Sequence, residues 1–230
     1  MNALTIFLAA GLVFHATHIL LSSTRLRGHL RDILGEDGFL ATYSAVALAT
    51  FIGFVVSYTK APLVVLWEVQ PGLRWVPMVV MPFACILLIC GYTTPNPTML
   101  GMERSAANDD PAPGILRITR HPVLWAAGLW GLCHIPPNGD LASIVFFGSI
   151  AALALGGTLL IDAKKRLALG TNWAIFAGLT SNLPFLALVT GRTRLRFRDV
   201  SLLRIVAGLL LYAVLLFGHP LLTGYPALPW

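Results

Sequence analysis

Long apolar runs recur along this chain, and they restrict its fold more than any other feature. The clearest lie at residues 3–21, 39–58, 75–92, 141–161 and 201–222. A run of about 18 or more apolar residues is long enough to cross a bilayer as a helix. Only 11% of the residues are charged, against about 25% in a soluble domain. The sequence therefore predicts an all-α, polytopic membrane helix bundle that forms a single integral membrane domain, residues 1–230.

Two further apolar segments need separate interpretation. One begins at Pro122, which suits the first turn of a helix because its missing N–H would have no partner there. The other, residues 172–189, is interrupted by Ser-Asn-Leu-Pro. A span there would also place the arginines at 192–198 opposite the basic residues at 164–166. We therefore expect about six transmembrane helices plus one interfacial or re-entrant segment at 172–189.

The basic residues indicate the orientation of the helices. Of the 16 Lys and Arg residues, three follow the first helix, residues 3–21, and three precede the fourth helix, which begins at Pro122. Eight lie within 162–204. The remaining two, Lys60 and Arg74, lie in the other connections. The positive-inside rule then places the basic connections in the cytoplasm and both termini on the opposite side. Topology and lipid headgroups account for the net charge of +6, so the sequence indicates a lipid bilayer and no nucleic acid as its partner. It does not indicate an oligomeric state.

Five of the six histidines lie within or at the edge of apolar segments: His15, His18, His121, His134 and His219. An ionisable residue inside a membrane is costly, and it is a functional hypothesis by default. The alternative is that each histidine is neutral and forms a hydrogen bond between helices. Neutral imidazole is also a common ligand of metals and of haem iron. Since no cysteine or carboxylate cluster accompanies these histidines in the membrane, a haem b held by two of them is favoured over a zinc or di-iron site.

Three motifs carry a resemblance to a known family. They are FHATHILLSSTRLR in the first helix, ITRHP followed by GLWGLCH in the fourth, and FGHPLLTGYPALPW at the C-terminus. Together they resemble the NnrU family of bacterial membrane proteins, which was named from denitrification gene clusters and is similar to 15-cis-ζ-carotene isomerase. The resemblance implies a multi-pass protein of the bacterial inner membrane, with both termini periplasmic by the charge count above. It also implies a haem b and redox-dependent cis–trans isomerisation of a carotenoid-like, apolar polyene.

The resemblance also suggests roles for single residues. The family histidine that precedes Ser and Arg in the first helix matches His18, and the one thirteen positions after the RHP histidine matches His134. We expect these two to be the axial iron ligands and the catalytic residues. His18 with His121 and His134 with His219 are rival pairs. Cofactor-binding roles, including contacts of arginine with the haem propionates, are expected for His15, Arg25, Arg120, His121 and His219.

Two other functions stay open at this point. The RHP triplet followed by DAKKRLALGTNWAIF resembles the isoprenylcysteine carboxyl methyltransferase group, which binds S-adenosylmethionine. In this chain Asp162 stands where that group has an acidic pair, while Trp173 and Phe176 stand where it has tyrosines. These departures remove polar groups that would hold the cofactor, so methyl transfer is disfavoured. An accessory membrane protein of nitrogen-oxide respiration is the non-catalytic alternative.

The orientation is testable with reporter fusions. A reporter at the C-terminus and one inserted within 162–200 should report opposite sides of the membrane, because the basic connections are retained in the cytoplasm. Paired alkaline phosphatase and green fluorescent protein fusions measure this. A C-terminal fusion that reports the cytoplasm would contradict the predicted topology.

Overall fold

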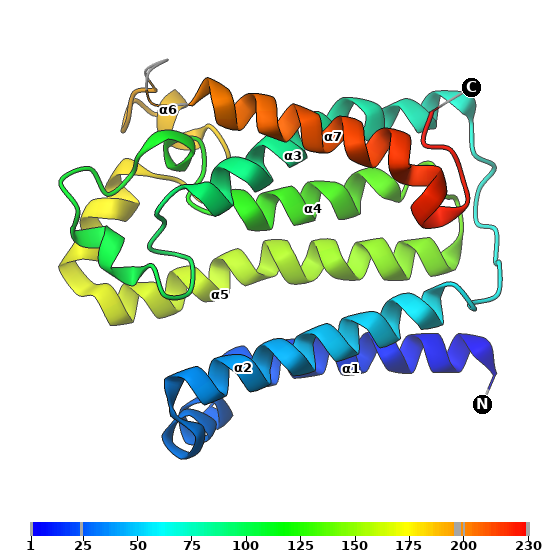
Figure 1. The fold of residues 1–230 in the computed structure, drawn as a ribbon, viewed down its shortest axis with the longest axis horizontal. Coiled ribbons are helices and arrows are strands. Elements are labelled where there is room, and N and C mark those ends of the chain that lie inside the picture. The colour runs from blue at the N-terminus through cyan, green and yellow to red at the C-terminus, as the bar shows by residue number, and fades with distance from the viewer. Residues whose placement is uncertain (1, 24, 196–198, 200, 229–230) are drawn as a thin grey trace. The chain divides into compact units, whose positions relative to one another are not determined.

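The computed structural model describes residues 2–23, 25–195, 199 and 201–228, and the described residues are helical with no β-strand (Figure 1). This confirms the predicted all-α membrane bundle. Seven α-helices and three short 3-10 helices occur in this part of the chain. The α-helices are α1 (Ala3–Ser23), α2 (Arg25–Tyr58), α3 (Trp75–Thr93), α4 (Pro122–His134), α5 (Leu141–Leu179), α6 (Leu186–Val189) and α7 (Leu202–Thr223). The 3-10 helices are η1 (Pro71–Arg74), η2 (Glu103–Ala107) and η3 (Gly114–Arg117).

Five of these helices are long and apolar enough to cross a membrane, namely α1, α2, α3, α5 and α7. The protein is therefore a multi-pass membrane protein. The helix expected at Pro122 is present as α4, but it has only 13 residues. At the α-helical rise this is about 20 Å, shorter than the ~30 Å hydrocarbon core. Helix α4, which begins at the proline of the RHP motif, is thus a short one. A folded connection, residues 94–121, precedes it and contains the Arg and His of the motif.

Two helices, α2 and α5, are interrupted at glycines, and their bounds differ from those predicted from the sequence. The basic segment after α1, expected as a turn, is helical up to Gly35, where φ is 71°. Helix α5 does not end at Ile161 but runs on to Leu179, with a break at Gly170, where φ is 52°. Only glycine adopts such positive φ values without steric cost, so each glycine ends one helix and allows the next to begin. The segment at 172–189 therefore consists of the last part of α5, a turn and α6, and it is not one continuous helix.

The described chain divides into two compact units, and the first comprises residues 1–69 and 138–149. Its core is aromatic. The ring of Phe54 lies 5.3 Å from that of Phe7 and 5.0 Å from that of Phe146, centroid to centroid. Helices α1 and α2 approach closely at Gly11, where a Cβ atom would lie 2.9 Å from the Phe54 ring. Aromatic packing thus joins α1, α2 and the start of α5.

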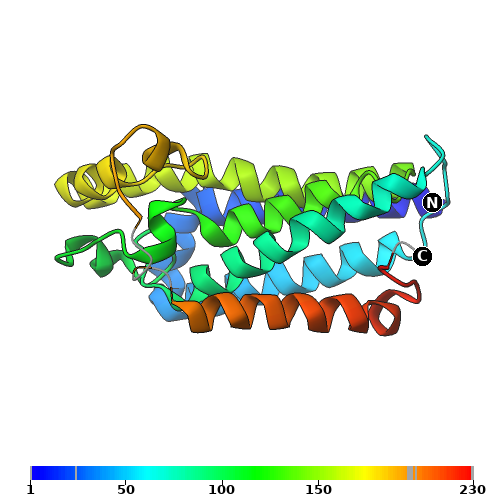
Figure 2. The ribbon, with the colours of Figure 1, turned by 90° about the horizontal axis from the view of Figure 1, so that it is seen from above.

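The second unit comprises residues 70–137 and 150–230. Helix α3 lies between α4 and α7 and contacts both (Figures 1 and 2). Small residues make these contacts possible. A Cβ atom on Gly91 would lie 2.9 Å from the Pro122 ring, and one on Gly208 would lie 2.7 Å from Cα of Ile86. Close backbone approach through glycine is the usual way in which membrane helices gain packing energy.

At one end of the second unit, two segments far apart in sequence lie together: the connection 94–121 and the segment that begins near Asp162 (Figure 1). Lys165 donates to Glu103 at 2.6 Å, and Arg204 donates to Thr94 at 2.9 Å. Two of the basic connections predicted to face the cytoplasm are therefore on the same end of this unit.

The glycine contact between α3 and α7 yields a prediction with a matched control. Gly208→Ala should lower the free energy of unfolding in detergent by about 1–3 kcal/mol, because its methyl group would collide with the backbone of α3. Gly218→Ala, on the same helix with no atom within 4 Å of the added Cβ, should be neutral or stabilising. Thermal unfolding of the purified variants measures both. Equal stability of the two variants would contradict the close α3–α7 packing.

Candidate functional site

The membrane histidines are held by hydrogen bonds that decide which ring nitrogen carries the proton. Nδ1 of His18 lies 2.8 Å from the carbonyl oxygen of Phe14, one turn earlier in α1. Because a carbonyl oxygen only accepts, Nδ1 must be the protonated nitrogen and Nε2 keeps its lone pair. The Phe14 ring lies 4.3 Å from the imidazole and the Tyr43 ring lies 6.1 Å from it. His18 therefore carries its lone pair on Nε2 and lies among aromatic side chains.

His134 repeats this arrangement in the second unit. Its Nδ1 lies 2.7 Å from the carbonyl oxygen of Trp130, again one turn earlier, so its Nε2 also carries the lone pair. The Trp130 ring packs against the imidazole at 5.3 Å. A hydrogen bond from Nδ1 to a backbone carbonyl is the usual partner of a metal-ligating histidine, because it fixes the tautomer and the ring orientation. The two expected ligands are thus in the protonation state that ligation requires, and their pairing stays a prediction.

The other two histidines of the apolar segments differ from one another. Both ring nitrogens of His15 face carbonyl oxygens, at 2.9 Å from Gly11 and 3.0 Å from Ser149. Neither nitrogen is open to an iron ion, so His15 is better suited to linking α1 to α5. Nδ1 of His219 lies 2.7 Å from the carbonyl oxygen of Tyr225, which leaves its Nε2 as the acceptor. His219 on α7 and His134 on α4 both belong to the second unit.

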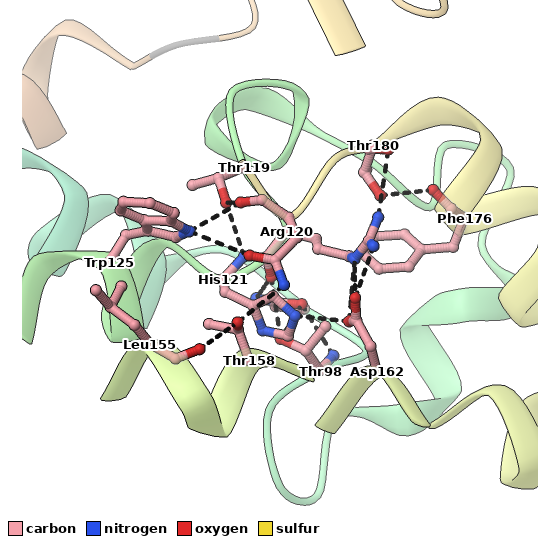
Figure 3. A network of polar contacts seen from close by, with 12 residues as sticks. Thr98, Thr119, Arg120, His121, Trp125, Leu155, Thr158, Asp162, Phe176 and Thr180 are labelled. Atoms are coloured by element: carbon pink, nitrogen blue, oxygen red, sulfur yellow. Dashed lines mark hydrogen bonds and ion pairs between the residues drawn. The ribbon is translucent and has the colours of Figure 1, made fainter. Parts of the chain in front are cut away.

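The RHP motif has a different role, centred on Asp162 of α5 (Figure 3). Nε and Nη2 of Arg120 donate to the Asp162 carboxylate at 3.0 Å and 2.6 Å. Nε2 of His121 lies 2.7 Å from the other oxygen of the same carboxylate. Side-chain exposure is 14% for Arg120, 1% for His121 and 12% for Asp162. One buried carboxylate therefore satisfies two neighbouring donors, and we call these three residues the RHP–Asp162 network.

Further polar contacts surround this network. The Arg120 guanidinium donates to the carbonyl oxygen of Thr180 at 3.3 Å and lies 5.6 Å from the centre of the Trp173 ring. The backbone carbonyl of Arg120 accepts from Asn96 at 3.1 Å. Asn182 accepts from the indole N–H of Trp125 at 2.8 Å through its own carbonyl. The network thus ties the connection 94–121, the start of α4, the middle of α5 and the turn at 180–182 to one another.

His121 is neutral in this setting. Burial lowers the pKa of His121 below its ordinary value, although the hydrogen bond to Asp162 acts in the opposite direction. Since Nε2 donates to Asp162, Nδ1 holds a lone pair, and this buried atom has no hydrogen-bond partner among the described residues. A neutral imidazole with an unused lone pair costs less than an imidazolium with an unused N–H, which would be a buried, unpaired donor.

The structure bears on two residues that were expected to contact the cofactor, Arg120 and Arg25. Arg120, expected near a haem propionate, has its guanidinium committed to Asp162, so a propionate would have to compete with that carboxylate. Arg25 begins α2, but its side chain lies outside the described residues. The roles of Asn96, Thr180 and Asn182 were not predicted. No spacing in the sequence marks them, since their partners lie 24, 60 and 57 residues away in the chain.

Comparison with known proteins agrees with the motifs. A family model described as NnrU protein matches residues 6–227. The chain is similar to 15-cis-zeta-carotene isomerase, chloroplastic, of Zea mays, with 25% identity over 236 residues that cover 98% of this chain and 63% of the relative. The corresponding protein of Arabidopsis thaliana is 27% identical over 231 residues, which cover 93% of this chain and 59% of the relative. The chain thus spans about three fifths of the length of these relatives. No solved structure matches it.

The RHP–Asp162 network predicts a large effect of a single substitution. Asp162→Asn should lower the free energy of unfolding in detergent by about 3–5 kcal/mol, because it leaves the buried Arg120 charge without its counter-ion. Glu103→Gln is the control, since it breaks the ion pair between Glu103 and Lys165, which lies one turn after Asp162 in α5. The Glu103 side chain is 38% exposed. The control should cost about 1 kcal/mol or less. Denaturant or thermal unfolding of both variants measures the difference, and similar losses would show that the network carries no special stability.

Proposed function

This chain belongs to the NnrU family, and on that premise we propose that it is a membrane isomerase that uses haem b to convert a cis double bond of an apolar polyene to trans. In this proposal His18 and His134 would hold the iron. The observation that carries the proposal is the tautomer of these two imidazoles. Each donates from Nδ1 to a backbone carbonyl one turn earlier, and each keeps its lone pair on Nε2. The similarity to 15-cis-zeta-carotene isomerases supplies the reaction class.

The donor chemistry of the chain fits a haem. Both imidazoles are partly buried, and each packs against an aromatic ring, Phe14 for His18 and Trp130 for His134. Apolar surroundings of this kind suit a porphyrin. A bound haem b would supply a redox-active iron centre with Lewis-acid chemistry toward a polyene.

The residues of this chain have three tasks in that reaction. His18 and His134 would hold the iron by neutral nitrogens whose basicity the backbone hydrogen bonds raise. The RHP–Asp162 network orients the first turn of α4, the helix that ends at His134. The apolar surface of the helices admits a substrate from the lipid phase, where a polyene dissolves, so no aqueous entrance is required.

Methyl transfer gains no support from this geometry. Asp162 stands at the position of the acidic pair of the methyltransferases. Its two carboxylate oxygens accept hydrogen bonds from Arg120 and His121. The aromatic residues at the positions of the tyrosines, Trp173 and Phe176, are buried at 3% and 0% exposure. They pack in the interior of the second unit, and neither side chain has a hydroxyl that could bind S-adenosylmethionine.

The absorption spectrum of the protein purified in detergent tests the proposal. The wild-type protein should show a Soret band and, when oxidised, a low-spin spectrum, because two imidazoles give a strong axial field. His18→Ala and His134→Ala should each shift the iron toward high spin or lose the haem. They should also abolish isomerisation of a 15-cis polyene by the reduced protein under anaerobic conditions.

The control is His29→Ala, which changes an exposed histidine of the helical segment before Gly35. Its spectrum should equal that of the wild type. Retention of a low-spin spectrum in both ligand variants would instead direct attention to His121 and His219. A wild-type protein that binds no haem after reconstitution would contradict the proposal as a whole.

A further inference from the structure

A second group of residues surrounds His18 at the end of the first unit where α1 leads into α2. The Tyr43 ring lies edge-on to the His18 imidazole at 6.1 Å, and it also stacks on Phe39 at 6.2 Å. The Arg27 guanidinium lies 5.7 Å from the centre of the Phe39 ring. It is also close enough to interact electrostatically with Tyr43. The side chains of His18, Tyr43, Phe39 and Arg27 thus form one cluster, which we call the His18 cluster.

Three polar groups of this cluster have no hydrogen-bond partner among the described residues, although Nδ1 of His18 is bonded to Phe14. Arg27 is partly buried, yet among the described residues it has no carboxylate and no hydrogen-bond acceptor. Arg31, one turn further along the same helix, is paired with Glu36 at 3.2 Å. The Tyr43 hydroxyl and Nε2 of His18 likewise have no hydrogen-bond partner in the part of the chain that the structure describes. One aromatic cluster thus carries three unused polar groups: a cation, a hydroxyl donor and a lone pair.

These three groups differ in what they can bind, and together they specify one ligand chemistry. The lone pair of an imidazole binds a metal ion, while a guanidinium binds a carboxylate through two parallel hydrogen bonds. Aromatic side chains between them suit the flat face of a conjugated ring. A planar metal chelate that carries carboxylates has all three features. A lipid headgroup would use the guanidinium alone.

We propose that Arg27, assisted by the Tyr43 hydroxyl, binds a propionate of the haem whose iron His18 ligates. This inference rests on the proposed function, and it assigns the carboxylate contact to a residue that the motifs did not single out. The pairing of three other arginines points the same way. Arg31 and Arg120 are already paired with carboxylates of the chain, and Arg117 is paired with Asp110 at 2.8 Å. Arg27 is the partly buried arginine of the first unit whose charge the described residues leave uncompensated.

Reconstitution with two porphyrins tests the assignment. Apoprotein in detergent is titrated with haem b and with haem b dimethyl ester, which has no free carboxylate. Wild-type protein should bind haem b about 10- to 100-fold more tightly than the ester, as expected for a charge-assisted hydrogen bond. Arg27→Gln should remove this preference by weakening haem b binding while leaving ester binding unchanged. Tyr43→Phe should weaken haem b binding by a few-fold, as expected for a neutral hydrogen bond.

The controls separate this role from a structural one. Arg31→Gln removes a charge from the same helix and should keep the wild-type preference for haem b. Arg27→Lys should restore part of it, because the charge returns without the bidentate geometry. The low-spin spectrum at saturating haem should persist in Arg27→Gln, since the imidazole ligands are unchanged.

Different failures lead to different conclusions. If wild-type protein binds neither porphyrin, the proposed function fails and this inference fails with it. If wild-type protein binds both equally, or if Arg27→Gln weakens both equally, the haem proposal stands and the Arg27 assignment is overturned. The assignment is also overturned if Arg27→Gln alters the protein only in nanodiscs that contain phosphatidylglycerol and not in zwitterionic ones, because the partner would then be an anionic lipid.

Discussion

The interior of a bilayer offers no water to a polar group, and the hydrogen bonds of this protein follow from that constraint. Within the spans the backbone is helical, and hydroxyl groups bond to carbonyl oxygens one turn earlier, as Thr17 and Thr50 do. The histidines His18 and His134 obey the same rule through Nδ1. The hydrogen bond that satisfies Nδ1 in the membrane therefore also sets the tautomer of each imidazole. In both residues the lone pair is left on Nε2.

Where the chain leaves the bilayer, a single carboxylate performs a similar task for two side chains. Asp162 lies 21 residues into α5, about 31 Å from its start and close to the ~30 Å thickness of the hydrocarbon. There it compensates the charge of Arg120 and the N–H of His121, two adjacent donors that burial would otherwise penalise. The RHP triplet is therefore explained by anchoring. Its arginine and histidine fix the first turn of α4, and its proline begins that helix.

Much of the fold follows directly from the sequence. The long helices are predicted by apolar runs of about twenty residues, by proline in a first turn and by the distribution of basic residues. Each of these signals depends on local composition alone. The bounds of α3 and α7 agree with expectation to within a residue or two. The helical segment before Gly35 and the continuation of α5 to Leu179 were missed, since polar residues can end a span without ending a helix. A backbone hydrogen bond forms equally well in the headgroup region, whereas hydropathy reports only the hydrocarbon.

The sequence by itself also determined which side chains are candidates for function, since histidine in an apolar segment is conspicuous. It could not show which nitrogens of each imidazole the folded chain occupies. That depends on partners far away in the chain: Ser149 for His15 and Asp162 for His121, both by hydrogen bonds, and the ring of Tyr43 for His18. Only the tertiary structure brings these groups into contact. Composition decides whether a residue can enter the membrane, but the role of an imidazole is decided by which of its two nitrogens the folded neighbours occupy.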